Sequence, residues 1–237
     1  MSCVILDRLA VFDDSSAQND AGSPLEATQR FATLRPRSHP SPWDFRLMAS
    51  LHEYLAGAAE LLARLPAAGL DKPVVAAIAA LNKALAARKT VLICGNGGSA
   101  SDAQHIAAEL VGRYERERVA LPVMALAGDA ATLTALGNDY GYERVFSRQV
   151  EAHGVPGGVF IGLSTSGKSS NVLKALEAAK TRGMTTIAFT GEGGGPIGAA
   201  ADILIAVPST TTARVQEMHI CLYHYICGQV ENAAPQA

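Results

Sequence analysis

Two segments of the chain combine small polar residues with side chains that acid–base or metal chemistry requires. Each has an apolar run, then a loop rich in Gly and Ser, and then a helical pattern; they span residues 91–110 and 159–180. Such a loop can direct backbone N–H groups and hydroxyls at an anion near a helix N-terminus. In the first segment His105 and Glu109 share one helix face because they are four residues apart. Phosphate-type loops beside a His/Glu face predict a sugar-phosphate enzyme.

The first loop, GNGGS at residues 95–99, has two interpretations. It can be a tight turn that joins a strand to a helix. It can also hold a ligand, because glycine permits positive φ and close approach to the backbone, and the Asn96 amide suits a sugar hydroxyl. His105 and Glu109 are similarly open. Alone they fit a solvated pair, but imidazole and carboxylate are also good ligands for a zinc-like ion and can move protons.

The second loop, STSGKS at residues 164–169, places more hydroxyl groups before a helix than a helix cap requires. Hydroxyls and backbone amides together suit a phosphate monoester. Residues 162–169 also match the nucleotide-binding pattern G-x-x-x-x-G-K-[ST]. However, Gly162 is predicted to lie inside the apolar strand rather than to open a loop, and no convincing hydrophobic strand ending in Asp follows it. The sequence therefore disfavours an NTPase site.

The last predicted helix carries polar side chains among apolar ones: Arg214, Gln216, Glu217, His219 and His224. Its two histidines could equally be core residues with satisfied nitrogens. By spacing alone, Gln216 pairs with His219, because Gln216 and His224 are about 12 Å apart along a regular helix. The string Asn138-Asp139-Tyr140-Gly141 is most simply a turn, although a turn at the end of a strand–helix unit can reach a ligand.

Composition limits the class of protein. The 237 residues are 49% hydrophobic but only 5% aromatic, which favours an α/β domain with a core of Ala, Leu, Val and Ile. A net charge of −2 gives no footprint for nucleic acid, and no Lys/Arg cluster suggests a membrane surface. The cysteines at positions 3, 94, 221 and 227 form no CxxC pair and predict reduced thiols in a cytoplasmic protein. No apolar run approaches the roughly 20 residues of a membrane span.

The pattern along the chain predicts an extension, a domain and a tail. Residues 1–44 are rich in Pro and Ser and are predicted to form a poorly ordered extension. From residue 45, leucines recur at helical spacing, and a second helix follows near residues 73–88. Apolar runs at residues 91–94, 121–127, 159–163, 185–190 and 203–207 then alternate with helices, ending in a helix over 211–231. This alternation predicts a parallel sheet covered on both faces, with ligands at the carboxyl ends of its strands.

Four longer strings combine these features: GNGGSASDAQHIAAELVGRY, LTALGNDYGYERVFSRQVEA, GLSTSGKSSNVLKALEAAKTRGM and ARVQEMHICLYHYICGQVE. Together they resemble the sugar isomerase (SIS) fold and, more narrowly, the bacterial phosphoheptose isomerase family. The resemblance covers nearly all of residues 45–232 and leaves 233–237 as a short tail. It implies an α/β fold of the SIS type, a three-layer sandwich with a central parallel sheet between helices, preceded by an N-terminal helical segment.

The resemblance also implies roles for individual residues. Sugar contacts fall on Asn96, Gly97, Gly98, Asn138 and Asp139, and phosphate contacts on Ser164, Thr165, Ser166 and Ser169. One Zn²⁺ per subunit would be held by His105, Glu109, Gln216 and His224, with Glu109 and Gln216 also touching substrate and Glu109 and His224 as the acid–base pair. Family members are generally homotetramers with active sites near subunit boundaries. Given their spacing, Gln216 and His224 share an ion only if Gln216 sits at a loose helix start or one of them comes from another subunit.

The reaction that this resemblance implies is the isomerisation of sedoheptulose 7-phosphate to D-glycero-D-manno-heptose 7-phosphate through an enediol. The product would feed heptose into lipopolysaccharide, capsule or related glycans. One alternative is a non-catalytic SIS protein that binds sugar phosphate or assists replication initiation, a kind that lacks the Glu109/His224 pair. Another is an SIS enzyme for a hexose phosphate or amino sugar. The chain departs from the family at Lys168, where Asn is often found, and in the extension at residues 1–44.

Overall fold

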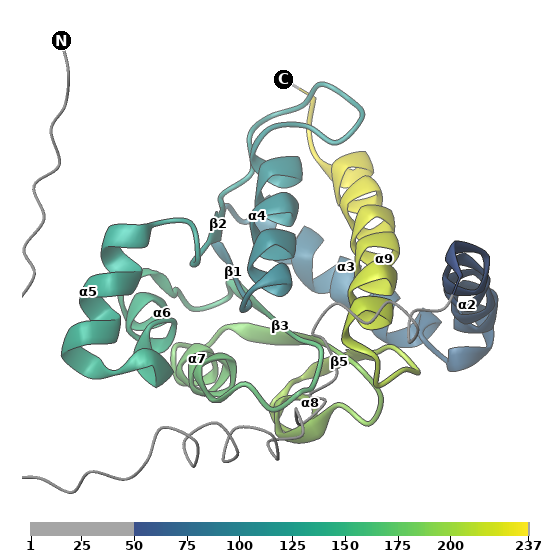
Figure 1. The fold of residues 1–237 in the computed structure, drawn as a ribbon. Helices are drawn as coiled ribbons and strands as arrows, with labels where there is room; N and C mark the ends of the chain where they lie inside the picture. Colours follow the sequence, from purple (N-terminus) through teal and green to yellow (C-terminus); the bar gives the residue numbers. More distant parts are fainter. Residues whose placement is uncertain (1–49, 237) are drawn as a thin grey trace, which may run out of the picture. The chain divides into compact units, whose positions relative to one another are not determined.

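The computed structural model describes residues 50–236, and Figure 1 shows their course. The elements in chain order are α2 Leu51–Arg64, η2 Leu65–Ala68, α3 Asp71–Ala86, β1 Val91–Cys94, α4 Gly98–Val111, β2 Val123–Ala125, α5 Ala130–Tyr140, η3 Tyr142–Arg144, α6 Ser147–His153, β3 Val159–Ser164, α7 Ser170–Thr181, β4 Thr185–Thr190, α8 Gly195–Ala200, β5 Ile203–Ala206 and α9 Thr212–Ala233. The predicted extension at residues 1–44 lies outside the described residues. Between residues 50 and 236, no helix has both the length and the apolar character needed to cross a membrane.

Five strands form one parallel sheet in the order β2-β1-β3-β4-β5. Every residue of β1 and β3 is buried, because helices cover both faces of a sheet of this kind. Each strand lies where an apolar run predicted one, although the run at residues 121–127 forms only the three residues of β2. The α/β fold predicted from the sequence is confirmed.

Two layers of helices complete the sandwich (Figure 1). Helices α3, α4 and α9 contribute to the apolar core on one face of the sheet, and α6, α7 and α8 to the core on the other. Alanines allow close approach between the layers: Ala103 of α4 and Ala175 and Ala179 of α7 are fully buried. The low aromatic content of the chain thus reflects helices that pack through small side chains.

Side-chain caps form at the starts of α2 and α5. Ser50 and Glu53 form a capping box at α2, in which each side chain accepts a hydrogen bond from the other residue's backbone N–H. At α5 the Asp129 carboxylate accepts from the N–H groups of Ala131 and Thr132. These bonds satisfy backbone donors that the first turn of a helix leaves free.

The strand order creates a switch point between β1 and β3. After β1 the chain moves outward to β2 and then returns to the other side of β1 as β3. In such sheets, ligands bind outside the carboxyl ends of the strands at this point, and both small-residue loops follow these two strands.

Gly162 lies inside β3, where a Cβ would sit 2.8 Å from Val172 Cγ1. This glycine therefore lets α7 pack on the sheet and does not open a nucleotide-binding loop.

Candidate functional site

The loop after β1 is joined to the start of α7 by a pair of side-chain amides. Asn96 Nδ2 donates to Asn171 Oδ1, and Asn171 Nδ2 donates to Asn96 Oδ1, both at 2.9 Å. The Tyr142 hydroxyl donates to Asn96 Oδ1 at 3.0 Å. Gly97, at the N-cap of α4, has a φ of 56°, which favours glycine. Asn96 thus bridges the switch point through its side-chain amide.

The loop after β3 gathers hydroxyl groups at the start of α7. Ser164 Oγ and Ser169 Oγ lie 2.9 Å apart, and the Lys168 N–H donates to Ser166 Oγ at 3.2 Å. Gly167 turns the loop with a φ of 64° and donates its N–H to Ser164 O at 2.9 Å. Ser169 is the N-cap of the 12-residue helix α7. The hydroxyls therefore gather at a helix N-terminus, where free N–H groups attract an anion.

Helices α4 and α9 lie side by side and run in the same direction (Figure 1). A Cβ on Gly98 would overlap the Gln216 amide. Seven residues further along each helix, the Tyr223 hydroxyl lies 2.9 Å from His105 Nδ1. Seven helical residues rise about 10 Å, so in one chain Gln216 lies about two turns from His105. Gln216 also falls within the regular helix α9 rather than at a loose start.

His105, Glu109 and His224 form a cluster between α4 and α9. His105 Nε2 lies 3.0 Å from Glu109 Oε1, and one ligand atom from each of the three residues lies within 4.8 Å of the others. The rings of His105 and His224 meet edge to face, with centroids 5.1 Å apart. The side chains of His105 and Glu109 are 43% and 20% exposed, so a ligand can reach them. Two imidazoles and a carboxylate fit both a zinc-like ion and an acid–base pair.

The two histidines of α9 have different environments. His219 is fully buried, its Nε2 lies 3.1 Å from Thr190 O, and its ring packs edge-on against Phe189. Burial lowers the pKa of His219 to about 4, because desolvation disfavours the charged ring. His219 therefore faces the sheet as a core residue. His224, rather than His219, joins His105 and Glu109, which corrects the pairing of Gln216 with His219 that spacing alone favours.

The prediction of a turn at Asn138 and Asp139 is wrong. Both residues lie in the last turn of α5, which ends at Tyr140, and Gly141 follows with a φ of 82°. The helix runs through Gly137 and Asn138 and ends only before Gly141, which takes the positive φ typical of a glycine after a helix. Asn138 Nδ2 donates to Asp139 Oδ1 at 2.8 Å. The chain then leads directly to Tyr142, whose hydroxyl contacts the loop after β1.

A buried carboxylate holds the segment that packs against His224. Glu231 accepts hydrogen bonds from the backbone N–H groups of residues 114–116 at 2.8, 2.8 and 2.9 Å. Its Oε1 lies 3.7 Å from Arg118 Nε, and both side chains are 2% exposed. The Arg118 guanidinium in turn donates to Glu109 O at 2.6 Å. This segment places the centroid of the Tyr114 ring 5.8 Å from that of the His224 ring. The contacts of Glu231 and Arg118 therefore stabilise both α4 and α9 near the cluster.

Sequence reasoning missed several residues that shape the site: Asp102, Arg118, Tyr142, Asn171, Tyr223 and Glu231. Two of them carry a local signal, since Asp102 shares a helix face with His105 and Asn171 lies two residues after the loop at residues 164–169. Tyr223 and Glu231 carry none, because their contacts join residues 118 and 117 positions apart.

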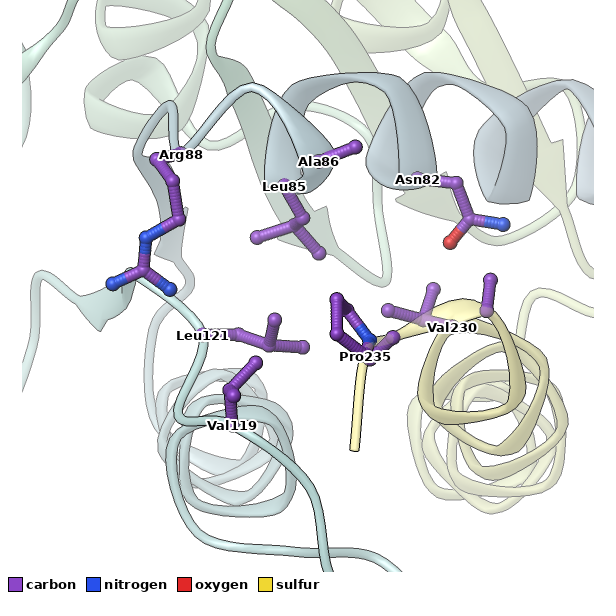
Figure 2. A pocket seen from close by; sticks show the side chains of 10 residues that line it. Asn82, Leu85, Ala86, Arg88, Val119, Leu121, Val230 and Pro235 are labelled. Atoms are coloured by element: carbon purple, nitrogen blue, oxygen red, sulfur yellow. The ribbon is translucent and has the colours of Figure 1, made fainter. Parts of the chain in front are cut away.

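A separate cavity of about 200 Å³ lies between the ends of α3 and α9, and Figure 2 shows the side chains that line it. Its lining is Asn82, Leu85, Ala86, Arg88, Val119, Leu121, Val230, Ala233, Ala234 and Pro235. Arg88 and Leu121 precede β1 and β2, which places the cavity toward the amino ends of these strands. Its lining is mostly apolar and includes no acid–base pair, and Arg88 already donates to Ala120 O. This cavity is therefore not the candidate active site.

The switch-point loops and the parallel sheet define a protein of the SIS domain class, and the SIS domain family matches residues 53–191. Phosphoheptose isomerase of Rhodospirillum rubrum is 59% identical over 143 residues, which cover 60% of this chain and 76% of that protein. The solved phosphoheptose isomerase of Neisseria gonorrhoeae is 42% identical with a TM-score of 0.72, covering 76% of this chain and 96% of the other. The solved phosphoheptose isomerase of Francisella tularensis is 36% identical with a TM-score of 0.74, covering 78% of this chain and 100% of the other. The chain belongs to the phosphoheptose isomerase family.

Proposed function

We propose that this chain converts sedoheptulose 7-phosphate to D-glycero-D-manno-heptose 7-phosphate, a heptose precursor for lipopolysaccharide, capsule or related glycans. The observation that carries the proposal is the meeting of Glu109 and His224, a carboxylate and an imidazole from two helices, in a partly exposed cluster. The names of the relatives supply the substrate class. A non-catalytic protein of this fold would have no need for such a pair.

The reaction moves hydrogen between neighbouring carbons. In our assignment, Glu109 acts as the base that removes a proton from C1, next to the C2 carbonyl, and a cis-enediol forms. The protonated carboxyl group then returns the proton to C2, while His224 transfers a proton from O1 to O2. The C1–H and O1–H bonds break, and the C2–H and O2–H bonds form. His105 Nε2, 3.0 Å from Glu109 Oε1, orients the carboxylate.

We assign the substrate phosphate to the loop after β3 and the sugar hydroxyls to the loop after β1 and the end of α5. The proposed phosphate ligands are Ser164, Thr165, Ser166 and Ser169, and the proposed sugar contacts are Asn96, Gly97, Gly98, Asn138 and Asp139. The hydroxyl pair of Ser164 and Ser169 and the free start of α7 support the phosphate assignment. Lys168 is exposed on this loop and adds a positive charge that favours an anion.

We further propose one Zn²⁺ per subunit at His105, Glu109 and His224. The fit rests on the donor set, two imidazoles and a carboxylate with ligand atoms within 4.8 Å of one another. When bound, such an ion polarises carbonyl and hydroxyl oxygens as a Lewis acid. Gln216 would be a fourth ligand, but in one chain it lies about two helical turns away. We therefore propose that a second copy of the chain supplies Gln216.

A shared site requires an oligomer, and we propose the homotetramer of the family. Exposed apolar side chains on α2 support an association surface: Leu51, Leu55 and Leu62 are 74%, 55% and 47% exposed. Patches of this kind commonly mark interfaces.

The free thiols of Cys94, Cys221 and Cys227 agree with a reducing compartment, and we propose the cytoplasm.

The test is to incubate the purified full chain with sedoheptulose 7-phosphate and follow the aldose product by NMR. Parallel samples contain a chelator, or fructose 6-phosphate in place of the heptulose phosphate. We expect conversion of the heptulose phosphate, loss of turnover with chelator, and little conversion of the hexose phosphate. The matched control is Glu151→Gln, an exposed carboxylate on α6 that pairs with Arg144 and Arg148.

Two outcomes would contradict the proposal. If the hexose phosphate is the better substrate, the chain is an SIS enzyme for a shorter sugar. If neither sugar is converted while both bind, the chain is a non-catalytic sugar-phosphate binder. Full turnover after exhaustive chelation would remove the metal from the mechanism and leave the acid–base pair.

A further inference from the structure

The Asp102 carboxylate is an unsatisfied group in the core beside the candidate site. Asp102 lies on α4 three residues before His105, is 6% exposed, and its Oδ2 has no hydrogen-bond partner. A buried carboxylate oxygen without a partner is costly and rare. Burial raises the pKa of Asp102 to about 6, although His105 and the Tyr223 hydroxyl act to lower it. Asp102 Oδ2 is thus a buried acceptor near Tyr223 that accepts no hydrogen bond in this arrangement.

Tyr223 neighbours both His105 and Asp102. Its side chain is 1% exposed, and its hydroxyl lies 2.9 Å from His105 Nδ1. A phenol has a single proton to donate. If Tyr223 donates to His105 Nδ1, nothing is left for Asp102, and if it donates to Asp102, its oxygen is free to accept from His105. The two arrangements exclude each other.

The choice decides which nitrogen of His105 carries the ring proton. A neutral imidazole has one N–H donor and one acceptor nitrogen. When His105 Nε2 donates to Glu109 Oε1, at 3.0 Å, Nδ1 accepts from Tyr223 and Asp102 Oδ2 stays unsatisfied. When Nε2 offers its lone pair to a cation, the ring proton must sit on Nδ1, and the Tyr223 oxygen accepts it. The Tyr223 proton then needs another acceptor, and Asp102 is the neighbour that provides one.

We infer that Asp102 and Tyr223 are positioning residues that select the His105 tautomer able to bind a divalent cation through Nε2. The unsatisfied carboxylate oxygen is the acceptor that the cation-binding arrangement uses. Histidine ligands of metals commonly donate their second N–H to a carboxylate or carbonyl, and here a tyrosine stands between ring and carboxylate. The inference rests on the cation part of the proposed function and not on the identity of the sugar.

The first experiment measures cation affinity directly. Metal-free full-length protein is titrated with Zn²⁺ against a chromophoric chelator, for wild type, Tyr223→Phe and Asp102→Asn. We expect each variant to bind Zn²⁺ about 10–100-fold more weakly, the usual cost of losing a partner of a metal-bound histidine. The amide of Asp102→Asn keeps the shape but can donate to the Tyr223 oxygen, which holds the tyrosine proton on His105. The matched controls, Tyr225→Phe and Asp71→Asn, change exposed residues on α9 and α3 and should bind as wild type does.

The second experiment uses only the wild-type protein, so it does not depend on whether the variants fold. In ¹⁵N-histidine-labelled wild type, multiple-bond ¹H–¹⁵N spectra report the tautomer of His105. We expect the Nε2–H form without metal and the Nδ1–H form with Zn²⁺. Wild-type affinity in both variants, or no change of tautomer on Zn²⁺ addition, would overturn the inference. Weaker binding in Tyr223→Phe alone would overturn the role of Asp102. A protein that shows the expected losses but isomerises no sugar phosphate would contradict the proposed function and leave this inference standing.

Discussion

Replacing Glu231 by glutamine is expected to destabilise the protein strongly, although the residue lies outside the reacting groups. The carboxylate receives three backbone N–H bonds from residues 114–116 and lies 3.7 Å from the Arg118 guanidinium. A glutamine oxygen at the Oε2 position would keep two of these bonds. Its NH₂ group would then face the Tyr114 N–H and Arg118 Nε, so donors would oppose donors and the Arg118 charge would lose its partner.

The magnitude follows from burial. Both partners are 2% exposed, and breaking a buried ion pair from one side costs about 3–5 kcal/mol because the remaining charge is left unpaired. For a domain of this size each kcal/mol lowers the thermal midpoint by about 2–4 °C, which gives a loss of roughly 6–20 °C. The matched surface change, Glu151→Gln, removes two ion pairs whose side chains are about 40% exposed and should cost less than about 1 kcal/mol per pair.

The assay is thermal and urea unfolding of both variants at pH 7 and in acid. Burial acts to raise the pKa of Glu231, but the amide hydrogen bonds and the Arg118 charge outweigh it and lower the pKa. The stabilisation is therefore present above the unfolded carboxyl pKa of about 4.3 and is lost as pH falls through the lower folded value. The difference between wild type and Glu231→Gln should shrink below about pH 4. If Glu231→Gln costs no more than Glu151→Gln at pH 7, the buried-charge argument is refuted.

Three further predictions concern chemistry, binding and pH. Glu109→Gln should lower turnover of sedoheptulose 7-phosphate by about 10²–10⁴-fold with an unchanged circular dichroism spectrum; near-normal turnover would exclude it as the base. Ser169→Ala should raise the dissociation constant for the sugar phosphate by about 10-fold or more, because a hydrogen bond to a charged group contributes about 1.5–3 kcal/mol, and calorimetry would show equal affinity if the phosphate lies elsewhere. The pKa of His219 is lowered to about 4, so below pH 6.5 only the unfolded chain gains this proton and wild type loses up to about 3 kcal/mol of stability by pH 4. His219→Gln should flatten that dependence in urea unfolding, and an unchanged slope between pH 6.5 and 4.5 would contradict it.

The sequence alone settles the local features of this protein. Apolar runs at residues 159–163 and 185–190 predict strands because a parallel sheet buries both faces, so hydrophobicity need not alternate. His105 and Glu109 share a face because helix geometry fixes the direction of side chains four residues apart. Gly162 is predicted within a strand because it lies inside an apolar run. Its position there disfavours a nucleotide-binding loop. Each of these properties depends on neighbours within one or two turns.

Tertiary structure decides which distant side chains meet. The sequence leaves both His219 and His224 open as partners of the first helix, and only the packing of α9 against α4 and the sheet turns His219 into the core and His224 toward Glu109. The same packing brings the Tyr223 hydroxyl to His105, 118 positions away. The end of α5 was also not evident from the sequence. This helix continues through Asn138 and its turn-forming neighbours and ends before Gly141. Backbone geometry sets the period of each element, but the rotation of one helix against another depends on side chains spread over the whole core, and no short stretch of sequence records it.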